Sequence, residues 1–275
     1  MDVRGAGGGR YLAPAHGPTE RNVVEAGQLL GAAVVAAARE VPGQRVTSVS
    51  MIFSRIVEHE APVEISVEVL RSGRTFTTAQ VRVGQHEKLC AAGVVLLDAG
   101  APDLVRTVEP MPPVPPPESL RPLAIPGTEV AGRDMRVVDD AYDPDPDRVG
   151  PPELFVWTRF ADAPAHEHLH AALLSQSATH WTVAAALRPH AGFGEAMAHR
   201  SISTGITMAT ITFHDDADVS GWLLYATRAT YTGRGHAHSE GRVYTREGGL
   251  AASYSVHAML RGIPDSAAAT AGPLL

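Results

Sequence analysis

Residues 220–261 read SGWLLYATRATYTGRGHAHSEGRVYTREGGLAASYSVHAMLR. Three apolar runs in this stretch, each containing β-branched or aromatic residues, are separated by glycine-rich breaks at 232–235 and 247–249. Runs of this kind that are bounded by such turns indicate β-strands. The stretch therefore predicts a β-meander of three antiparallel strands, at 222–230, 235–245 and 250–260.

The first half of the chain contains a second copy of this pattern. Gly233 follows Gly73 by 160 positions, and Phe213 follows Phe53 by the same 160 positions. A constant offset between separate landmarks indicates that one module has been duplicated. We therefore expect two modules of the same architecture in this chain.

Each half also contains one long segment of small apolar residues with the character of a helix. The segment 20–40 is rich in alanine and ends before Pro42, and the segment 169–187 is similar and ends before Pro189. A helix that is apolar on nearly every face is surrounded by protein. Further strands are predicted at 46–53, 63–69, 75–83, 89–97, 154–160 and 203–213.

Proline-rich sequence separates the two halves. Residues 112–117 read PPVPPP and residues 143–147 read DPDPD, which excludes a helix or a central strand at either place. We therefore expect an N-terminal domain at 1–100, a linker at 101–150 and a C-terminal domain at 151–275. Each domain is predicted to be an α+β unit whose sheet curls around its helix.

The composition argues against several classes of function. The 275 residues carry a formal net charge of −7 without a basic patch, so nucleic-acid binding is not expected. No leader peptide is evident, and no apolar run is long enough to span a membrane. The single cysteine, Cys90, falls in a predicted strand, and a reducing, cytoplasmic location is expected. The Gly- and Pro-rich residues 1–18 are expected to be loosely ordered.

Several short motifs occur in a fixed order along the chain. They are Phe53-Ser54-Arg55, Leu187-Arg188-Pro189-His190, Phe213-His214, Trp222-Leu223-Leu224-Tyr225 and Gly233-Arg234-Gly235. With the order of helices and strands, they make residues 26–261 similar to the TesB-type acyl-CoA thioesterases, or thioesterase II. The resemblance implies a double hotdog, in which two helix-in-sheet modules are fused into one continuous sheet. It also implies an acyl-CoA or acyl-carrier thioester as ligand, no metal or organic cofactor, and a homodimer of double hotdogs.

The resemblance also locates the hydrolytic site, and there the sequence departs from the family. The family has an Asp in the second helix, a Thr or Ser in the next strand and a Gln in the last strand. These positions fall on Thr179, Ile206 and Val256. Threonine is not a base at neutral pH, and Ile206 and Val256 cannot hydrogen-bond a water. Hydrolysis then requires a different base, and histidine titrates in the appropriate range.

The candidate catalytic residues are therefore Thr179 and His180, with His214 and His257 as other possible bases. The candidate substrate-binding residues are Ile206, Val256, His257 and Phe213. Each candidate also has a purely structural interpretation: Thr179 as a small helix residue packed under the sheet, and His180 as a hydrogen-bonded core residue.

Two other groups of residues, both between 162 and 170, have the composition of a functional site. The histidines of His166-Glu167-His168-Leu169-His170 alternate as metal ligands can, but a solvated first turn of a helix explains them more simply, so no metal site is expected. Asp162 and His166 resemble the Asp…His pair of hotdog hydratases, although their spacing is one residue short.

Two functions from different classes remain open. In the first, the protein is an acyl-thioester hydrolase that has replaced its water-activating group, with the acyl chain in a tunnel between the two hotdogs. In the second, a divergent double hotdog has lost hydrolysis and binds or otherwise transforms an acyl-like or secondary-metabolite ligand.

Overall fold

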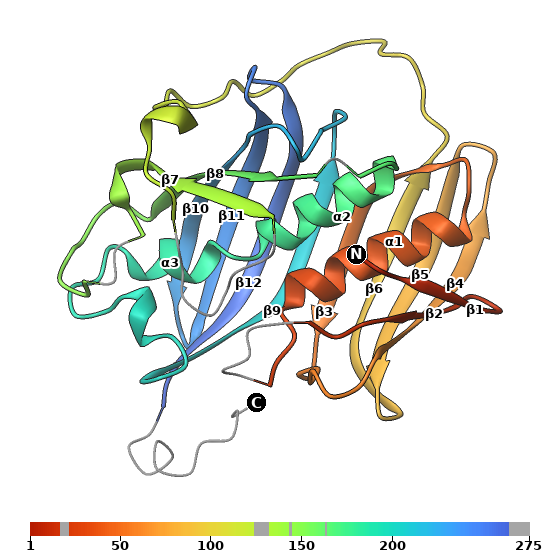
Figure 1. Ribbon diagram of the computed structural model, residues 1–275, viewed down its shortest axis with the longest axis horizontal. Coiled ribbons are helices and arrows are strands. Elements are labelled where there is room, and N and C mark those ends of the chain that lie inside the picture. Colours follow the sequence, from red (N-terminus) through yellow and green to blue (C-terminus); the bar gives the residue numbers. More distant parts are fainter. Residues whose placement is uncertain (17–21, 124–131, 143–144, 163, 264–275) are drawn as a thin grey trace.

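The protein forms one long antiparallel sheet that curls around its helices (Figure 1). The computed structural model describes residues 1–275 except 17–21, 124–131, 143–144, 163 and 264–275. The helices are α1 (Ala26–Glu40), α2 (Glu167–Ala178) and α3 (Thr182–Leu187), with short 3-10 turns η1 (Pro117–Ser119), η2 (Val138–Asp140) and η3 (Glu195–Met197).

Each half contributes four long strands to the middle of the sheet and two shorter strands to one edge. The N-terminal strands are β1 (Arg4–Gly7), β2 (Arg10–Ala13), β3 (Arg45–Phe53), β4 (Val63–Ser72), β5 (Phe76–Gln85) and β6 (Lys88–Asp98). The C-terminal strands are β7 (Arg133–Val137), β8 (Glu153–Phe160), β9 (Ile202–Phe213), β10 (Leu223–Gly233), β11 (His236–Thr245) and β12 (Leu250–Gly262). In the described part of the chain they form a 12-stranded sheet in the order β1-β2-β4-β5-β6-β3-β9-β12-β11-β10-β8-β7.

The two halves join where β3 pairs with β9, and this seam confirms the predicted duplication. Ser50 pairs with Thr210, and their side-chain oxygens are 2.9 Å apart. These two residues are also separated by 160 positions, the offset that relates the two halves. A residue that faces its own counterpart lies on a local twofold axis, so the axis relating the modules passes through this pair. The double hotdog predicted from the sequence is therefore the observed architecture.

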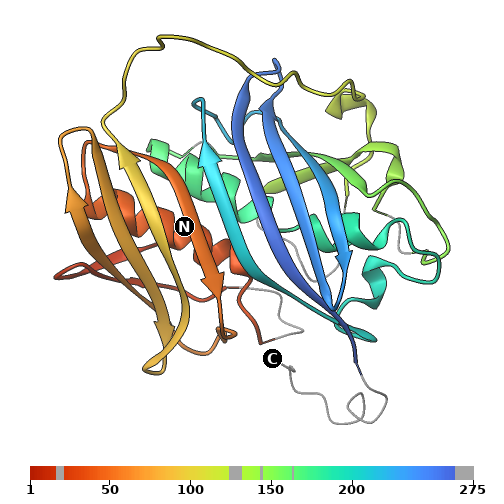
Figure 2. The ribbon, with the colours of Figure 1, turned by 180° about the vertical axis from the view of Figure 1, so that it is seen from behind.

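The helices pack against the concave face of the sheet and against each other (Figures 1 and 2). A Cβ atom on Gly27 would lie 2.4 Å from the carbonyl oxygen of Gln176, and one on Gly31 would lie 2.8 Å from that of Ala172. The contact runs in opposite directions along the two helices, so α1 and α2 are antiparallel. Small residues let the two backbones approach this closely.

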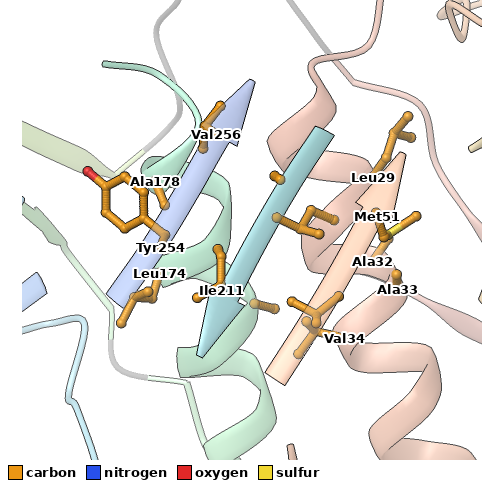
Figure 3. Close-up of a cluster of buried hydrophobic side chains, with 14 of the residues drawn as sticks. Leu29, Ala32, Ala33, Val34, Met51, Leu174, Ala178, Ile211, Tyr254 and Val256 are labelled. Atoms are coloured by element: carbon orange, nitrogen blue, oxygen red, sulfur yellow. The ribbon is translucent and has the colours of Figure 1, made fainter. Parts of the chain in front are cut away.

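Apolar side chains between the helices and the central strands form the core (Figure 3). Met51 on β3 and Ile211 on β9 are fully buried beneath the helices, which contribute Leu30 and Leu174 among others. Alternate residues of each strand point into this layer, as the period of two in a β-strand requires. The core is continuous across the seam, so neither half encloses its helix independently.

The N-terminal residues are more ordered than the sequence indicated. The expectation of loose order at 1–18 is wrong for β1 and β2, which form a hairpin that extends the sheet through pairing of β2 with β4. Tyr11 is buried and its hydroxyl donates to Glu40 at 2.6 Å, which anchors the hairpin to the end of α1.

Two further predictions need correction in the C-terminal half. The segment 101–150 is not only a linker, because it contains β7, which pairs with β8 at the sheet edge. The helix predicted at 169–187 is interrupted: α2 ends at Ala178 and α3 begins at Thr182. In the parts of the chain that the structure describes, no helix combines the length and apolarity needed to cross a membrane.

The contact at Gly27 provides a test of the helix packing. In Gly27→Ala the new methyl group meets the backbone of α2, which cannot move as a flexible side chain can. We expect a loss of about 1 to 3 kcal/mol in the free energy of unfolding, measured by urea denaturation. Gly205→Ala is the matched control because a Cβ there meets no atom within 4 Å. Equal midpoints for the two variants would contradict the packing described.

Candidate active site

Elements from both halves meet at the interruption between α2 and α3. Thr179 is the C-cap residue that follows α2, and its hydroxyl donates to the carbonyl oxygen of Gln176 at 3.3 Å. A threonine hydroxyl that bonds the preceding turn competes with the helix hydrogen bonds. The chain continues through His180 and Trp181 before α3 begins, and Gly27 of α1 lies directly against Thr179. We call this place the helix junction.

The ring of His180 lies inside the helix junction with only 14% of its side chain exposed. Its Nε2 atom is 2.6 Å from a guanidinium nitrogen of Arg133 and 3.6 Å from a carboxylate oxygen of Glu25. Arginine can only donate, so Nε2 is the acceptor and the proton of the neutral ring is on Nδ1.

Burial lowers the pKa of His180 to about 4, while the charges of Glu25 and Arg133 act in opposite directions. The ring is therefore neutral near pH 7. Its basic nitrogen is already occupied by Arg133. His180 is suited to donate a hydrogen bond rather than to accept a proton.

Arg133 brings a positive charge into the helix junction from β7. Its pKa is lowered, chiefly by burial, and the nearby carboxylate of Glu25 acts against that shift. Arginine nevertheless stays protonated in proteins. The linker region thus supplies a cation that the sequence analysis did not anticipate.

Glu25 immediately precedes α1 and occupies its N-cap position. Its carboxylate does not cap the helix, and 26% of the side chain is exposed. The group is therefore directed toward His180 while it remains accessible to water.

Aromatic side chains enclose the rest of the helix junction. Trp181 is fully buried, and its ring meets that of Tyr142 edge to face with centroids 6.2 Å apart. The hydroxyl of Tyr225 donates to the carbonyl oxygen of Leu174 at 3.1 Å. Burial raises the pKa of both tyrosines, and for Tyr142 the neighbouring carboxylate of Glu195 adds to the effect. Both phenols are therefore protonated at neutral pH.

A cleft beside α3 borders this cluster. It is partly open to solvent. Tyr142 and Glu195 line it, and Tyr142 therefore separates the cleft from Trp181. The remaining lining residues are Ala141, Asp145, Arg148, Val149, Ala184, Leu187, Arg188, Phe193 and Gly194.

The substrate-binding candidates lie on two faces of the sheet. Val256 is fully buried and belongs to the same apolar cluster as Ala178 at the end of α2 (Figure 3). Ile206 packs partly buried against the core, and Phe213 is 8% exposed at the end of β9. His257 follows Val256 on β12, so it points to the opposite face, where it is exposed.

The other histidines singled out from the sequence have partners away from the helix junction. His257 packs against His238 with ring centroids 4.4 Å apart, and His214 shares a hydrogen bond of 3.0 Å with the hydroxyl of Ser253. The structure therefore brings together Thr179 and His180 but places His257 on the outer face. The catalytic and binding assignments stay predictions.

The histidines at the start of α2 do not converge. The rings of His166 and His168 stack 5.4 Å apart, whereas Nε2 of His170 lies 3.0 Å from the carbonyl oxygen of Pro164. Within the described ranges, no group of three His, Cys, Asp or Glu residues is arranged to hold a metal ion.

Sequence reasoning missed Glu25 and Arg133 for identifiable reasons. Glu25 stands between two apolar pairs, Val23-Val24 and Ala26-Gly27, and a charge at such a position is an available signal. Arg133 alternates with the buried Met135 on β7, but the surrounding prolines concealed this short strand.

Comparison with known proteins gives consistent matches over most of the chain. Residues 15–97 match the acyl-CoA thioesterase N-terminal domain, and residues 106–259 match the acyl-CoA thioesterase C-terminal domain. Acyl-coenzyme A thioesterase 8 from Homo sapiens is 25% identical over 267 residues, which cover 86% of this chain and 80% of that protein.

Solved structures share the fold. An acyl-CoA thioesterase II, TesB2, from Mycobacterium marinum superposes with a TM-score of 0.79 at 24% identity, covering 96% of this chain and 97% of that one. A hot dog fold protein of unknown function from Alicyclobacillus acidocaldarius superposes with a TM-score of 0.77 at 18% identity, covering 96% of each chain.

The lowered pKa of His180 makes stability depend on pH. Between about pH 6.5 and 4 the unfolded chain binds a proton at this residue that the folded protein excludes, so stability falls as the pH falls. From pH 7 to about pH 5, we expect wild type to lose on the order of 2 kcal/mol more unfolding free energy than His180→Gln. Urea denaturation at both pH values measures the difference. The exposed His190→Gln should retain the wild-type slope, and a His180→Gln protein with that same slope would refute the assignment.

Proposed function

Because the chain belongs to the acyl-CoA thioesterase family, we propose that it hydrolyses acyl-CoA thioesters at the helix junction. The observation that carries the proposal is the set of polar groups gathered there within an otherwise apolar interior. A neutral His180 and the cation of Arg133 lie beside the N-terminus of α1, which is directed toward the helix junction. This arrangement supports a reaction in which negative charge develops on a carbonyl oxygen.

In this proposal the thioester carbonyl lies at the first turn of α1. The first amide groups of an α-helix have no partner within the helix, and they carry the positive end of its dipole. The amides of Ala26 and Gly27 are then available to polarise the carbonyl oxygen. His180 lines the opposite side and donates a hydrogen bond. The hydroxyl of Thr179, which donates to Gln176, lies beside it, and the apolar side chains of Val256 and Ile206 face the acyl chain.

Ligand binding without hydrolysis is the less favoured alternative. The family match extends over both domains, and the helix junction keeps polar groups that a purely apolar binding pocket does not need. A carrier-protein thioester has the same reacting atoms as acyl-CoA, so the proposal extends to it as a possible substrate. No part of this chemistry calls for a metal or an organic cofactor.

We also propose that the protein works as a homodimer through the face of the sheet that carries no helix (Figure 2). Near the local twofold axis this face presents the hydroxyls of Ser50 and Thr210 beside Ile52 and Val94, which are 55% and 47% exposed. An exposed apolar patch favours protein association, and a twofold axis at its centre favours pairing with a second copy. A cytoplasmic location completes the proposal and fits the one cysteine, Cys90, which is buried and free.

Hydrolysis is tested with a panel of acyl-CoA thioesters of increasing chain length, with release of the free thiol as the measurement. Wild type should hydrolyse at least one member, and His180→Ala should lower kcat about tenfold or more because a donor at the reacting centre is lost. His190→Ala, at an exposed position, is the control. If wild type binds these thioesters but releases no thiol from any of them, the hydrolase proposal fails and the binding alternative replaces it.

The dimer is tested by light scattering. Wild type should have twice the chain mass of 29.0 kDa, and Ile52→Lys combined with Val94→Lys should give monomers because charges are placed in the contact. Leu12→Lys, on β2 next to the edge strand and 43% exposed, should remain dimeric. A monomeric wild type, or a double variant that stays dimeric, would contradict the proposed interface.

A further inference from the structure

We propose that Glu25 is the catalytic base, which takes a proton from the attacking water. This assignment rests on the proposed function and adds a residue to it. Neither the sequence analysis nor the family match places a catalytic group at this position.

The carboxylate of Glu25 is held in a fixed place by its neighbours in the chain. The amide of Val24 donates to the carbonyl oxygen of Val57 at 2.7 Å, and Val24 is buried. Two residues after Glu25, Gly27 packs against the backbone of α2 at Gln176. Glu25 therefore stands between two anchored residues, and its position relative to α2 is determined by close packing.

The contacts of Glu25 leave its carboxylate available to a water. Its nearest oxygen is 3.6 Å from Nε2 of His180, which exceeds hydrogen-bonding distance. Within the described residues, no hydrogen bond to this carboxylate is formed, and the group does not cap α1. An exposed fraction of 26% admits solvent from one side. A water between Glu25 and the first turn of α1 would meet both a base and the amides that polarise the carbonyl.

Five other polar groups at the helix junction cannot serve as the base, and Glu195, the carboxylate beside Tyr142, is compared with Glu25 in the test. Arg133 is a cation, and Thr179 has only a hydroxyl. Nε2 of His180 already accepts a hydrogen bond from Arg133. Tyr142 and Tyr225 are protonated, since burial raises the pKa of both. Arg133 also lies close enough to Glu25 for their charges to interact.

The water oxygen attacks the thioester carbonyl carbon while one water proton passes to a carboxylate oxygen of Glu25. The tetrahedral intermediate then collapses, the carbon–sulfur bond breaks with its electron pair on sulfur, and Glu25 returns the proton to that sulfur. The products are a carboxylic acid and a free thiol, and the carboxylate is regenerated.

The test compares Glu25→Gln with Glu25→Asp in the full chain, using kcat and KM for the best substrate of the wild-type panel. Glu25→Gln preserves size and removes the base, so kcat should fall about 100- to 10,000-fold with little change in KM. Glu25→Asp should recover part of that loss because it restores a carboxylate. Glu68→Gln, exposed on β4, is the control and should keep wild-type kcat.

Three results would overturn the assignment. A Glu25→Gln enzyme that is as stable to heat as wild type and within about threefold of its kcat shows that the carboxylate is not the base. A large loss of kcat in Glu195→Gln without one in Glu25→Gln moves the role to Glu195. A wild type that hydrolyses no thioester removes the proposed function itself, and this assignment with it, whereas the first two results leave hydrolysis intact.

Discussion

The structure depends on the close approach of α1 and α2 at the centre of one continuous sheet. The two halves of the sheet are joined along β3 and β9, so the helices that they enclose must lie side by side. No side chain fits between Gly27 and the carbonyl of Gln176. This contact places the beginning of one helix against the end of the other. The helix junction therefore exists because of the packing, and the polar groups there are added to a geometry that the core already imposes.

Burying polar groups in such a place is unfavourable unless they satisfy one another. A charged arginine away from solvent needs hydrogen-bond acceptors and a compensating charge. Arg133 finds an acceptor in His180 and a compensating charge in Glu25, while the histidine avoids a second positive charge by remaining neutral. Three elements far apart in the sequence are thereby tied together by one small network. The network forms a polar spot within a core that is otherwise largely alanine, valine and leucine.

The features that the two halves share could be predicted from the sequence better than the features found in one half only. Phe53 and Phe213 end equivalent strands. This equivalence could be predicted because duplicated modules keep the same residue type at a few positions even when most positions have changed. The hairpin of β1 and β2 was missed because its glycine content resembles that of a flexible terminus, and only Tyr11 and its bond to Glu40 show why it folds.

The site was harder to predict because its members come from places with little local pattern. A five-residue strand such as β7 gives too short an alternation to recognise among prolines. The break at Thr179 is equally difficult to foresee, since the local composition favours a continuous helix and tertiary contacts interrupt it. Glu25 and His180 are 155 positions apart, and their proximity follows from the packing of α1 against α2 and not from any motif.

The pair at the seam, Ser50 and Thr210, has a consequence for how this protein changes over time. In an assembly of two identical chains, every substitution would appear twice, once on each side of the axis. A single fused chain is free of that rule, and here the two partners on the axis already differ by a methyl group. One half can therefore acquire a carboxylate while the other acquires a histidine. An asymmetric active site can arise in this way within a fold that is almost twofold symmetric.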